Sequence, residues 1–144
     1  MRISHILLPV DGSSYSDNAI DYAIYLAKLS GAQVTAVSCY EWLGGTPDIA
    51  ESVLSNLREK LKQQADTVLD DAGRKLTENG ITYATRSISG APGTMLSNLA
   101  KSKEFDLIVM GSHGHSDIAG LFLGSVTHKV LNTIYCPILV VPES

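Results

Sequence analysis

The sequence has few cysteines, no excess of basic residues and no long apolar run. Its two cysteines, Cys39 and Cys136, stand in or beside apolar stretches without the spacing of metal ligands, which favours small buried side chains over a disulfide. With 11 basic and 15 acidic residues the net charge is -4, which argues against a surface for DNA or RNA. The N-terminal apolar run is too short for a signal peptide or a membrane span. We therefore expect a cytoplasmic protein with neither a nucleic-acid nor a membrane partner.

The sequence also lacks the signatures of several enzyme classes. It contains no nucleophile elbow and no protein-kinase signature. Its main glycine loop, Gly111-Ser-His-Gly114, has neither the G-x-G start of the dinucleotide fingerprint nor the Gly-Lys-Ser/Thr of a Walker A loop. No P-loop lysine is therefore present to neutralise a phosphoryl group during its transfer. These absences favour binding of a ligand over its efficient turnover.

The pattern of apolar residues predicts strands alternating with helices in one domain, residues 1–144. At 144 residues, 44% hydrophobic and 18% charged, the chain has the size and composition of one globular domain. Apolar runs predict strands at residues 3–10, 33–39, 81–88, 105–110 and 137–141. Helical stripes cover residues 14–31, about 48–79, about 95–100 and from 124 to about 134. This alternation predicts an α/β fold, an open parallel five-stranded sheet with helices on both faces.

Two of these helices carry further signals. Ser14 with Asp17 resembles a capping box at the start of the first helix, and Gly31 is typical of its end. The stripe over 48–79 is long enough for a coiled coil, but Gln64 and Asp71 interrupt a strict heptad. A helix lying across the sheet is the favoured interpretation. The segment before it, from Tyr40 to Pro47, carries loop signals.

The glycine loop joins the fourth predicted strand to the last predicted helix. Glycines allow backbone N–H groups to approach an anion without a Cβ in the way. The first turn of the following helix adds N–H donors and the positive end of its dipole. A strand, a glycine loop and a helix start in this order therefore favour a phosphate site.

The full pattern is more specific than its parts. G-x-x-G at 111–114, nine intervening residues and then Gly124-Ser125 resemble the nucleotide-binding signature of the universal stress protein family. The resemblance extends to Pro9-Val-Asp11-Gly-Ser and covers the chain as far as Val141. It implies a Rossmann-like fold of the adenine nucleotide alpha hydrolase type with strand order 3-2-1-4-5. In that order the first and fourth strands flank a switch point, where ligands bind beyond the carboxyl ends of strands.

The resemblance implies ATP as the ligand, with Mg²⁺ carried on its phosphates. The candidate binding residues are Pro9, Val10, Asp11, Cys39, Met110, Gly111, His113, Gly114, Gly124, Ser125 and Val126. Asp11 would meet the ribose hydroxyls or a nucleotide-bound metal, although by itself it is also a common turn residue. His113 and His115 do not predict a metal site of the protein alone, because only Gly114 separates them and loop histidines beside an anion are the simpler interpretation. No catalytic residue is expected.

The expected function is that of an ATP-binding regulatory protein of the stress response, in which nucleotide alters partner choice or assembly. Two alternatives stay open: a structural dimer of the same fold that binds no nucleotide, and an ATP-dependent enzyme, at most a slow ATPase. A homodimer is expected through the fifth strand, from Pro137 to Val141, which the resemblance places at the sheet edge. Its inner residues are all apolar and include no lysine, so an unpaired edge would invite aggregation.

Overall fold

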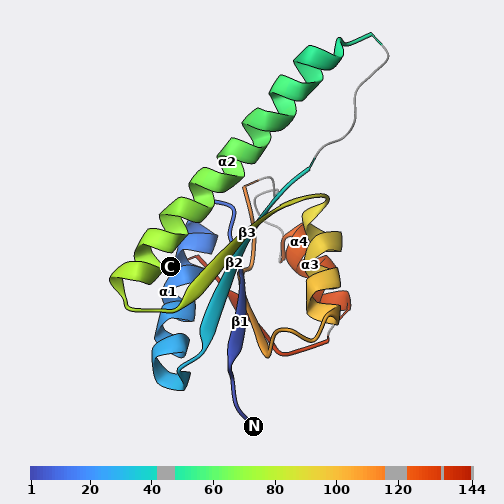
Figure 1. Cartoon of the computed structure of the whole chain (residues 1–144). Coiled ribbons are helices and arrows are strands. Elements are labelled where there is room, and N and C mark those ends of the chain that lie inside the picture. Colours follow the sequence, from blue (N-terminus) through green and yellow to red (C-terminus); the bar gives the residue numbers. More distant parts are fainter. Residues whose placement is uncertain (42–47, 116–122, 134, 144) are drawn as a thin grey trace.

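The computed structural model describes residues 1–41, 48–115, 123–133 and 135–143 and contains one five-stranded sheet. The neighbouring strands are parallel and run in the order β3-β2-β1-β4-β5. The α/β fold and the strand order 3-2-1-4-5 are thereby confirmed (Figure 1). The strands are β1 (His5–Pro9), β2 (Gln33–Tyr40), β3 (Tyr83–Ser89), β4 (Leu107–Gly111) and β5 (Ile138–Val141). The helices are α1 (Ser14–Ser30), α2 (Glu51–Glu78), α3 (Pro92–Lys101) and α4 (Ser125–Asn132).

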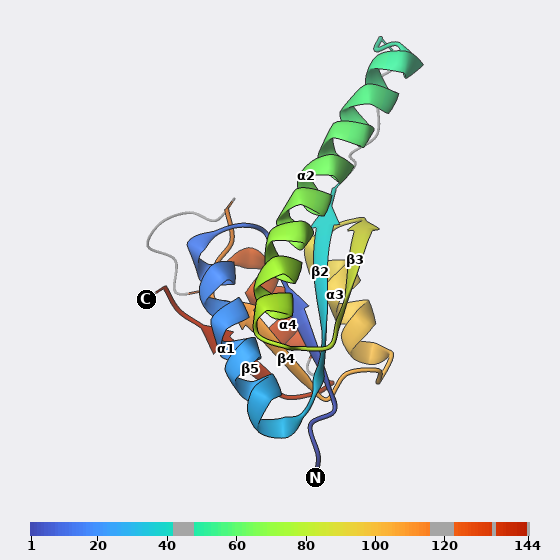
Figure 2. The same ribbon diagram turned by 60° about the vertical axis from the view of Figure 1, so that its left-hand side comes forward.

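The central strands divide their side chains between two hydrophobic cores. Ile6 and Leu8 of β1 and Val109 of β4 pack with residues of α1 and α2 on one face of the sheet. Leu7 of β1 and Ile108 of β4 pack with residues of α3 and α4 on the other face. Figures 1 and 2 show this division, with α1 and α2 on one side and α3 and α4 on the other. Because both faces are covered, these strands are apolar throughout rather than alternating.

The start of α1 differs by one residue from the predicted capping box. Ser13, not Ser14, is the N-cap, and its side chain accepts a hydrogen bond from the backbone N–H of Ser16 at 3.2 Å. Ser14 is already helical, and its hydroxyl donates to the carboxylate of Glu143 instead. The predicted end is confirmed, because Gly31 has a φ of 76° and donates its N–H to Ala27. A left-handed residue of this kind closes a helix most easily when it is glycine.

Helix α2 packs on the sheet along only half of its length. Its buried residues begin at Ala65 and recur to Leu76, so the predicted helix across a sheet is confirmed for this half. The preceding residues 51–64 contain no buried side chain and project past the sheet as an arm (Figure 2). Asp48 lies before the helix rather than in it.

The remaining boundaries differ slightly from those predicted. Tyr40 belongs to β2, because it pairs with Ser89, and residues 42–47 of the predicted loop lie outside the described residues. Ile134, the predicted end of the last helix, also lies outside them. Among the described residues, no helix combines the length and the apolar character that crossing a membrane requires.

The order of the strands fixes where the chain can form a crevice. From β1 the chain proceeds through β2 to β3 at one edge, and it then returns to β4 on the other side of β1. The connections that leave β1 and β4 therefore diverge, which opens space beyond the carboxyl ends of these two strands. The loops at residues 11–13 and 112–115 begin at this point.

Candidate functional site

A pocket of about 360 Å³ lies beyond the carboxyl ends of β1, β2 and β4. The elements around it contribute small and apolar side chains together with two carboxylates and two histidines. Its lining residues are Pro9, Val10, Asp11, Ser16, Val37, Cys39, Glu41, Pro92, Leu96, Met110, Gly111, His113, Gly114, His115, Val126 and Thr127. A volume of this size is within the range of small-molecule sites, roughly 300–1,000 Å³.

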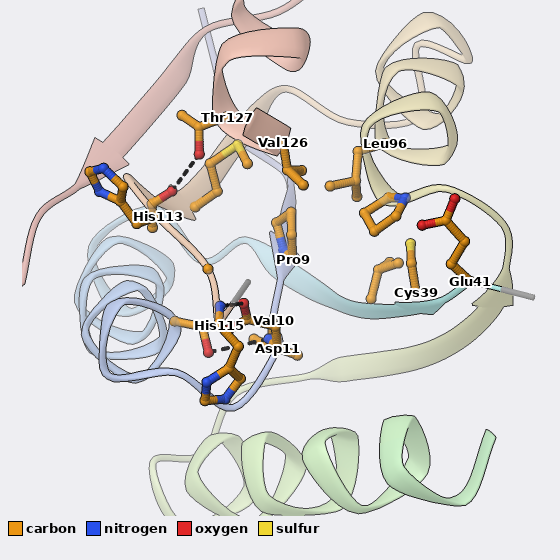
Figure 3. Close-up of a pocket in the computed structure, with 16 residues that line it drawn as sticks. Pro9, Val10, Asp11, Cys39, Glu41, Leu96, His113, His115, Val126 and Thr127 are labelled. Atoms are coloured by element: carbon orange, nitrogen blue, oxygen red, sulfur yellow. Dashed lines mark hydrogen bonds between the residues drawn. The ribbon is translucent and has the colours of Figure 1, made fainter. Parts of the chain in front are cut away.

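The pocket has two chemically different ends. Cys39, Glu41 and Leu96 gather at one end, whereas Asp11 and His115 lie at the other (Figure 3). Burial raises the pKa of the Cys39 thiol to about 11, so this side chain is neutral and packs as a small apolar group. Cys39 and Cys136 are both half-buried and free of a disulfide. The first end therefore suits a flat apolar group, with Glu41 as the acceptor at its rim.

Asp11 joins the two loops that form the other end. Its Oδ1 accepts a hydrogen bond from the N–H of Ser13 at 2.9 Å, which is the local turn expected of an aspartate. Its Oδ2 accepts from the N–H of His115 at 3.0 Å, in the loop that follows β4. Figure 3 marks the second of these bonds, between Asp11 and His115, which both line the pocket. One carboxylate thus fixes the spacing of two loops that are far apart in the sequence.

Gly111 lies at the end of β4, where the chain leaves no room for a side chain. A Cβ built there would stand 2.7 Å from the Cβ of Tyr15 and 3.0 Å from its carbonyl carbon. The carbonyl oxygen of Gly111 accepts a hydrogen bond at 2.8 Å from the hydroxyl of Thr127, whose side chain is buried. The close approach to α1 and the bond to α4 hold the start of the glycine loop in place.

Helix α4 begins beside this loop. Gly124 is its N-cap, and the N–H of Gly124 donates to the carbonyl of Ser112 at 2.8 Å. Ser125 is the first helical residue. The first N–H groups of a helix have no partner within it and carry the positive end of its dipole. The side chains of Val126 and Thr127 in the same turn line the pocket.

Neither His113 nor His115 belongs to a group of metal ligands among the described residues. The Nδ1 of His113 lies 3.0 Å from the hydroxyl of Ser112, and its ring centre lies 5.1 Å from that of Tyr15. Burial, followed by the charge of Glu143, raises the pKa of the Tyr15 hydroxyl, so this ring is a neutral support for His113. In the part of the chain that the structure describes, no three ligand-type side chains are placed to hold a metal ion.

The structure brings together most of the residues that the sequence singled out. All of the candidates except Gly124 and Ser125 line the pocket, and these two lie at the adjoining start of α4. Sequence reasoning did not select Ser16, Val37, Glu41, Pro92, Leu96, His115 or Thr127 for the site. Position alone could have indicated Pro92, because it opens a helix directly after β3 at the same edge of the sheet. In the sequence, Val37 and Leu96 have the spacing of buried core residues, so no sequence pattern distinguishes them as pocket residues.

Comparison with known proteins gives a consistent result. The sequence model of the universal stress protein family matches residues 2–142. The chain is 34% identical over 143 residues to universal stress protein YxiE of Bacillus subtilis, covering 94% of this chain and 97% of YxiE. The solved structure of protein MJ0577 of Methanocaldococcus jannaschii matches with a TM-score of 0.86 and 25% identity, over 100% of this chain and 99% of that one.

A second solved structure was determined with a bound ligand. It is a universal stress protein in complex with cAMP, which matches with a TM-score of 0.75 and 28% identity over 100% of both chains. The strand order, the glycine loop at the switch point and the match over nearly the whole sequence agree with one another. The chain belongs to the universal stress protein family.

Proposed function

We propose that this chain binds ATP in the pocket beyond β1 and β4 and works as a nucleotide-dependent regulatory protein. The observation that carries the proposal is the anion cradle, formed by the loop at residues 111–115 and the first turn of α4. Backbone N–H groups in a glycine loop and at a helix start bind phosphate without needing a cationic side chain. The tight fit around Gly111 holds this loop in a fixed position.

The opposite end of the pocket fits adenine. Val37, Cys39 and Leu96 offer apolar surfaces to a flat ring, and Glu41 offers an acceptor to an exocyclic amine. The relative that was solved in complex with cAMP supports an adenine nucleotide as the ligand class. The ribose would then lie between the two ends, within reach of Val10 and Asp11.

The charges in the pocket favour ATP that carries a cation. Among the described residues that line the pocket, no lysine or arginine is present, while Asp11 and Glu41 are acidic. A bare triphosphate would meet an uncompensated carboxylate at the loop end, and like charges repel. Mg²⁺ prefers phosphate and carboxylate oxygens, so Asp11 is the residue that would face a metal brought in by the nucleotide.

Calorimetric titration with ATP and MgCl₂ tests the proposal. We expect saturable binding of one nucleotide per chain, weakened by removal of Mg²⁺, and weaker binding of GTP, which presents a carbonyl oxygen to Glu41. Tighter binding of cAMP than of ATP would keep the adenine site and overturn the choice of ligand. If the chain is instead a structural dimer that binds no nucleotide, neither compound would give heat at millimolar concentration.

Bound ATP is expected to survive many minutes on the protein. No lysine or arginine is present among the described residues that line the pocket, so little stabilises charge that develops at the γ-phosphate. Turnover should fall far below a typical enzyme value of roughly 10 per second. The release of inorganic phosphate from a stoichiometric complex of the protein and ATP measures this turnover rate. A rate near that value, lost in Asp11→Asn or His113→Ala, would show that the chain is an ATP-dependent enzyme.

We further propose that β5 pairs with its own copy in a homodimer. The strand lies at the sheet edge, and Ile138, Leu139 and Val140 are only partly buried. The C-terminal tail does not run along this edge. Its Pro142 carbonyl accepts a hydrogen bond from Asn18, and Glu143 accepts one from Ser14, so the tail is fastened to α1.

Val140→Pro is expected to reduce the mass of the assembly by about half. The carbonyls of Pro137 and Val141 accept hydrogen bonds from Ile108 and Ser112 on the β4 side. Because backbone groups alternate along a strand, the N–H of residue 140 points away from β4 and is available to a second copy. Proline removes this donor and leaves the β4–β5 ladder intact.

Sedimentation equilibrium of both proteins at about 10 μM measures the change. Circular dichroism checks that the variant retains its secondary structure. A wild-type monomer, or a folded variant with the mass of the wild type, would show that β5 is not the interface.

A further inference from the structure

The arm of α2, defined as residues 51–64, is the largest feature of the fold that the nucleotide site does not explain. Fourteen residues at about 1.5 Å each extend about 21 Å beyond the part of the helix that packs on the sheet. The arm leaves the domain at the same edge as the carboxyl ends of β2 and β3 (Figure 1). A helix of this length that buries none of its residues gains little stability from its own domain.

The arm presents an apolar seam although no part of the sheet lies beneath it. Val53 is 48% exposed and Leu57 is 47% exposed, while Leu54 and Leu61 are half-buried. Ala50, the N-cap directly before the arm, and positions 54, 57 and 61 follow one another at intervals of four, three and four residues, the spacing of the a and d positions of a heptad. The seam stops where Gln64 and Asp71 occupy the next two d positions, just where the helix begins to pack on the sheet.

The charges along the arm indicate what covers the seam. The beginning of the arm and the residues before it carry Asp48 and Glu51, a net charge of -2. Residues 58–62 carry three basic side chains and Glu59, a net charge of +2. A parallel pair of arms would place like charges together, whereas an antiparallel pair would place each acidic end against a basic segment.

We propose that the arm binds the arm of a second copy of this chain as a short antiparallel coiled coil. The two-fold axis passes between residues 55 and 56, so that Leu54 faces Leu57 of the second copy and Ala50 faces Leu61. In this register Glu51 lies beside Arg58 of the second copy on both sides of the axis. The contact is self-complementary, so each arm binds one other arm. It is separate from β5, which lies at the far edge of the sheet from β3.

Disulfide trapping between two single-cysteine proteins tests this register. One protein carries Ala50→Cys and the other, enlarged by a tag, carries Leu61→Cys, both in a Cys39→Ala/Cys136→Ala background. In the antiparallel pair the two new thiols face each other. Two copies of the same variant place their thiols about 16 Å apart, eleven residues along the axis, which is too far for a disulfide.

We expect the mixture at about 50 μM to form the tagged heterodimer at least about tenfold faster than a matched control. The control mixes Ser52→Cys with tagged Gln63→Cys, which have the same separation of eleven residues but lie on the outer face of the helix. Adding Leu57→Glu to both members of the test pair should reduce the rate to that of the control. Each protein alone should form little homodimer.

Three results would overturn the proposal. Equal rates in the test and control mixtures would show that the seam is solvated or reserved for a different protein. Rapid homodimer formation by the single variants would indicate a parallel pair. A rate that Leu57→Glu leaves unchanged, in a variant with wild-type circular dichroism, would show that the seam residues do not hold the two arms together.

Discussion

Ser125→Asp is expected to weaken ATP binding about 30-fold while leaving the protein as stable as the wild type or slightly more stable. Ser125 opens α4, whose first turn contains no acidic residue. The new carboxylate would face the phosphates of ATP, and two charges about 4 Å apart at the protein surface repel by about 4 kcal/mol. Because the side chain at position 125 is exposed, we expect about half of this repulsion. A loss of about 2 kcal/mol corresponds to about 30-fold in the dissociation constant.

The same carboxylate should favour the helix that it opens. An acidic group in the first turn interacts with the dipole by about 0.3–1 kcal/mol, which raises the melting temperature of a chain of this size by about 1–3 °C. Calorimetry and thermal unfolding measure the two effects, with Ser125→Asn as the neutral control of similar size. Parallel loss of affinity and stability would mean that the variant damages the fold, and an unchanged affinity would place the phosphates elsewhere.

Gly111→Ala is expected to destabilise the protein by about 3 kcal/mol and to lower its melting temperature by about 6–12 °C. The new methyl group would stand 2.7 Å from the Cβ of Tyr15 and 3.0 Å from its carbonyl carbon. Neither partner can move easily, because Ser13 caps the first turn of α1 and β4 is held between β1 and β5. Affinity for ATP should fall as well, since the loop starts at this residue.

Gly93→Ala is the matched control for this variant. A Cβ at Gly93 would meet the Cδ of Lys129 at 2.8 Å, an overlap of almost the same size. Lys129 can change its rotamer, and alanine is the better helix former by about 1 kcal/mol, so the control should be neutral or stabilising. Thermal unfolding of the two variants decides the matter. If both variants lower the melting temperature equally, the rigid surroundings of Gly111 are not the reason why a side chain at this position destabilises the protein.

The architecture could be predicted from the sequence because its signals are local and mutually consistent. Buried parallel strands are continuous apolar runs, and the stripe of α1 ends at Gly31 with the geometry that this residue favours. Periodicity alone does not order the strands, whereas the resemblance to the family implies their order. Only in that order do Asp11 and Gly111 belong to one site.

Other features could not be predicted from the sequence. In some cases several side chains can take the same role, and in others an apolar pattern does not show what the apolar residues pack against. Ser13 and Ser14 can both cap α1, and the choice depends on which hydroxyl meets the N–H of Ser16. The stripe of α2 keeps a spacing of three or four residues from the arm into the packed half, and the breaks at Gln64 and Asp71 do not by themselves show where the sheet begins. Val37 and Leu96 line the pocket with the same side chains that fill the core, which hides them from sequence reasoning.

Titration of the ¹⁵N-labelled chain with ATP and Mg²⁺, followed by NMR, tests the proposed site most directly. We expect saturable changes in the amide signals of residues 111–115 and of Ser125 to Thr127. The signals of Val10 and Cys39, which also line the pocket, should change with them. The amide signals of the α2 arm, which lies outside the pocket, should keep their positions. Absence of any saturable change at millimolar ATP, or changes confined to residues outside the pocket, would contradict an ATP site between β1 and β4.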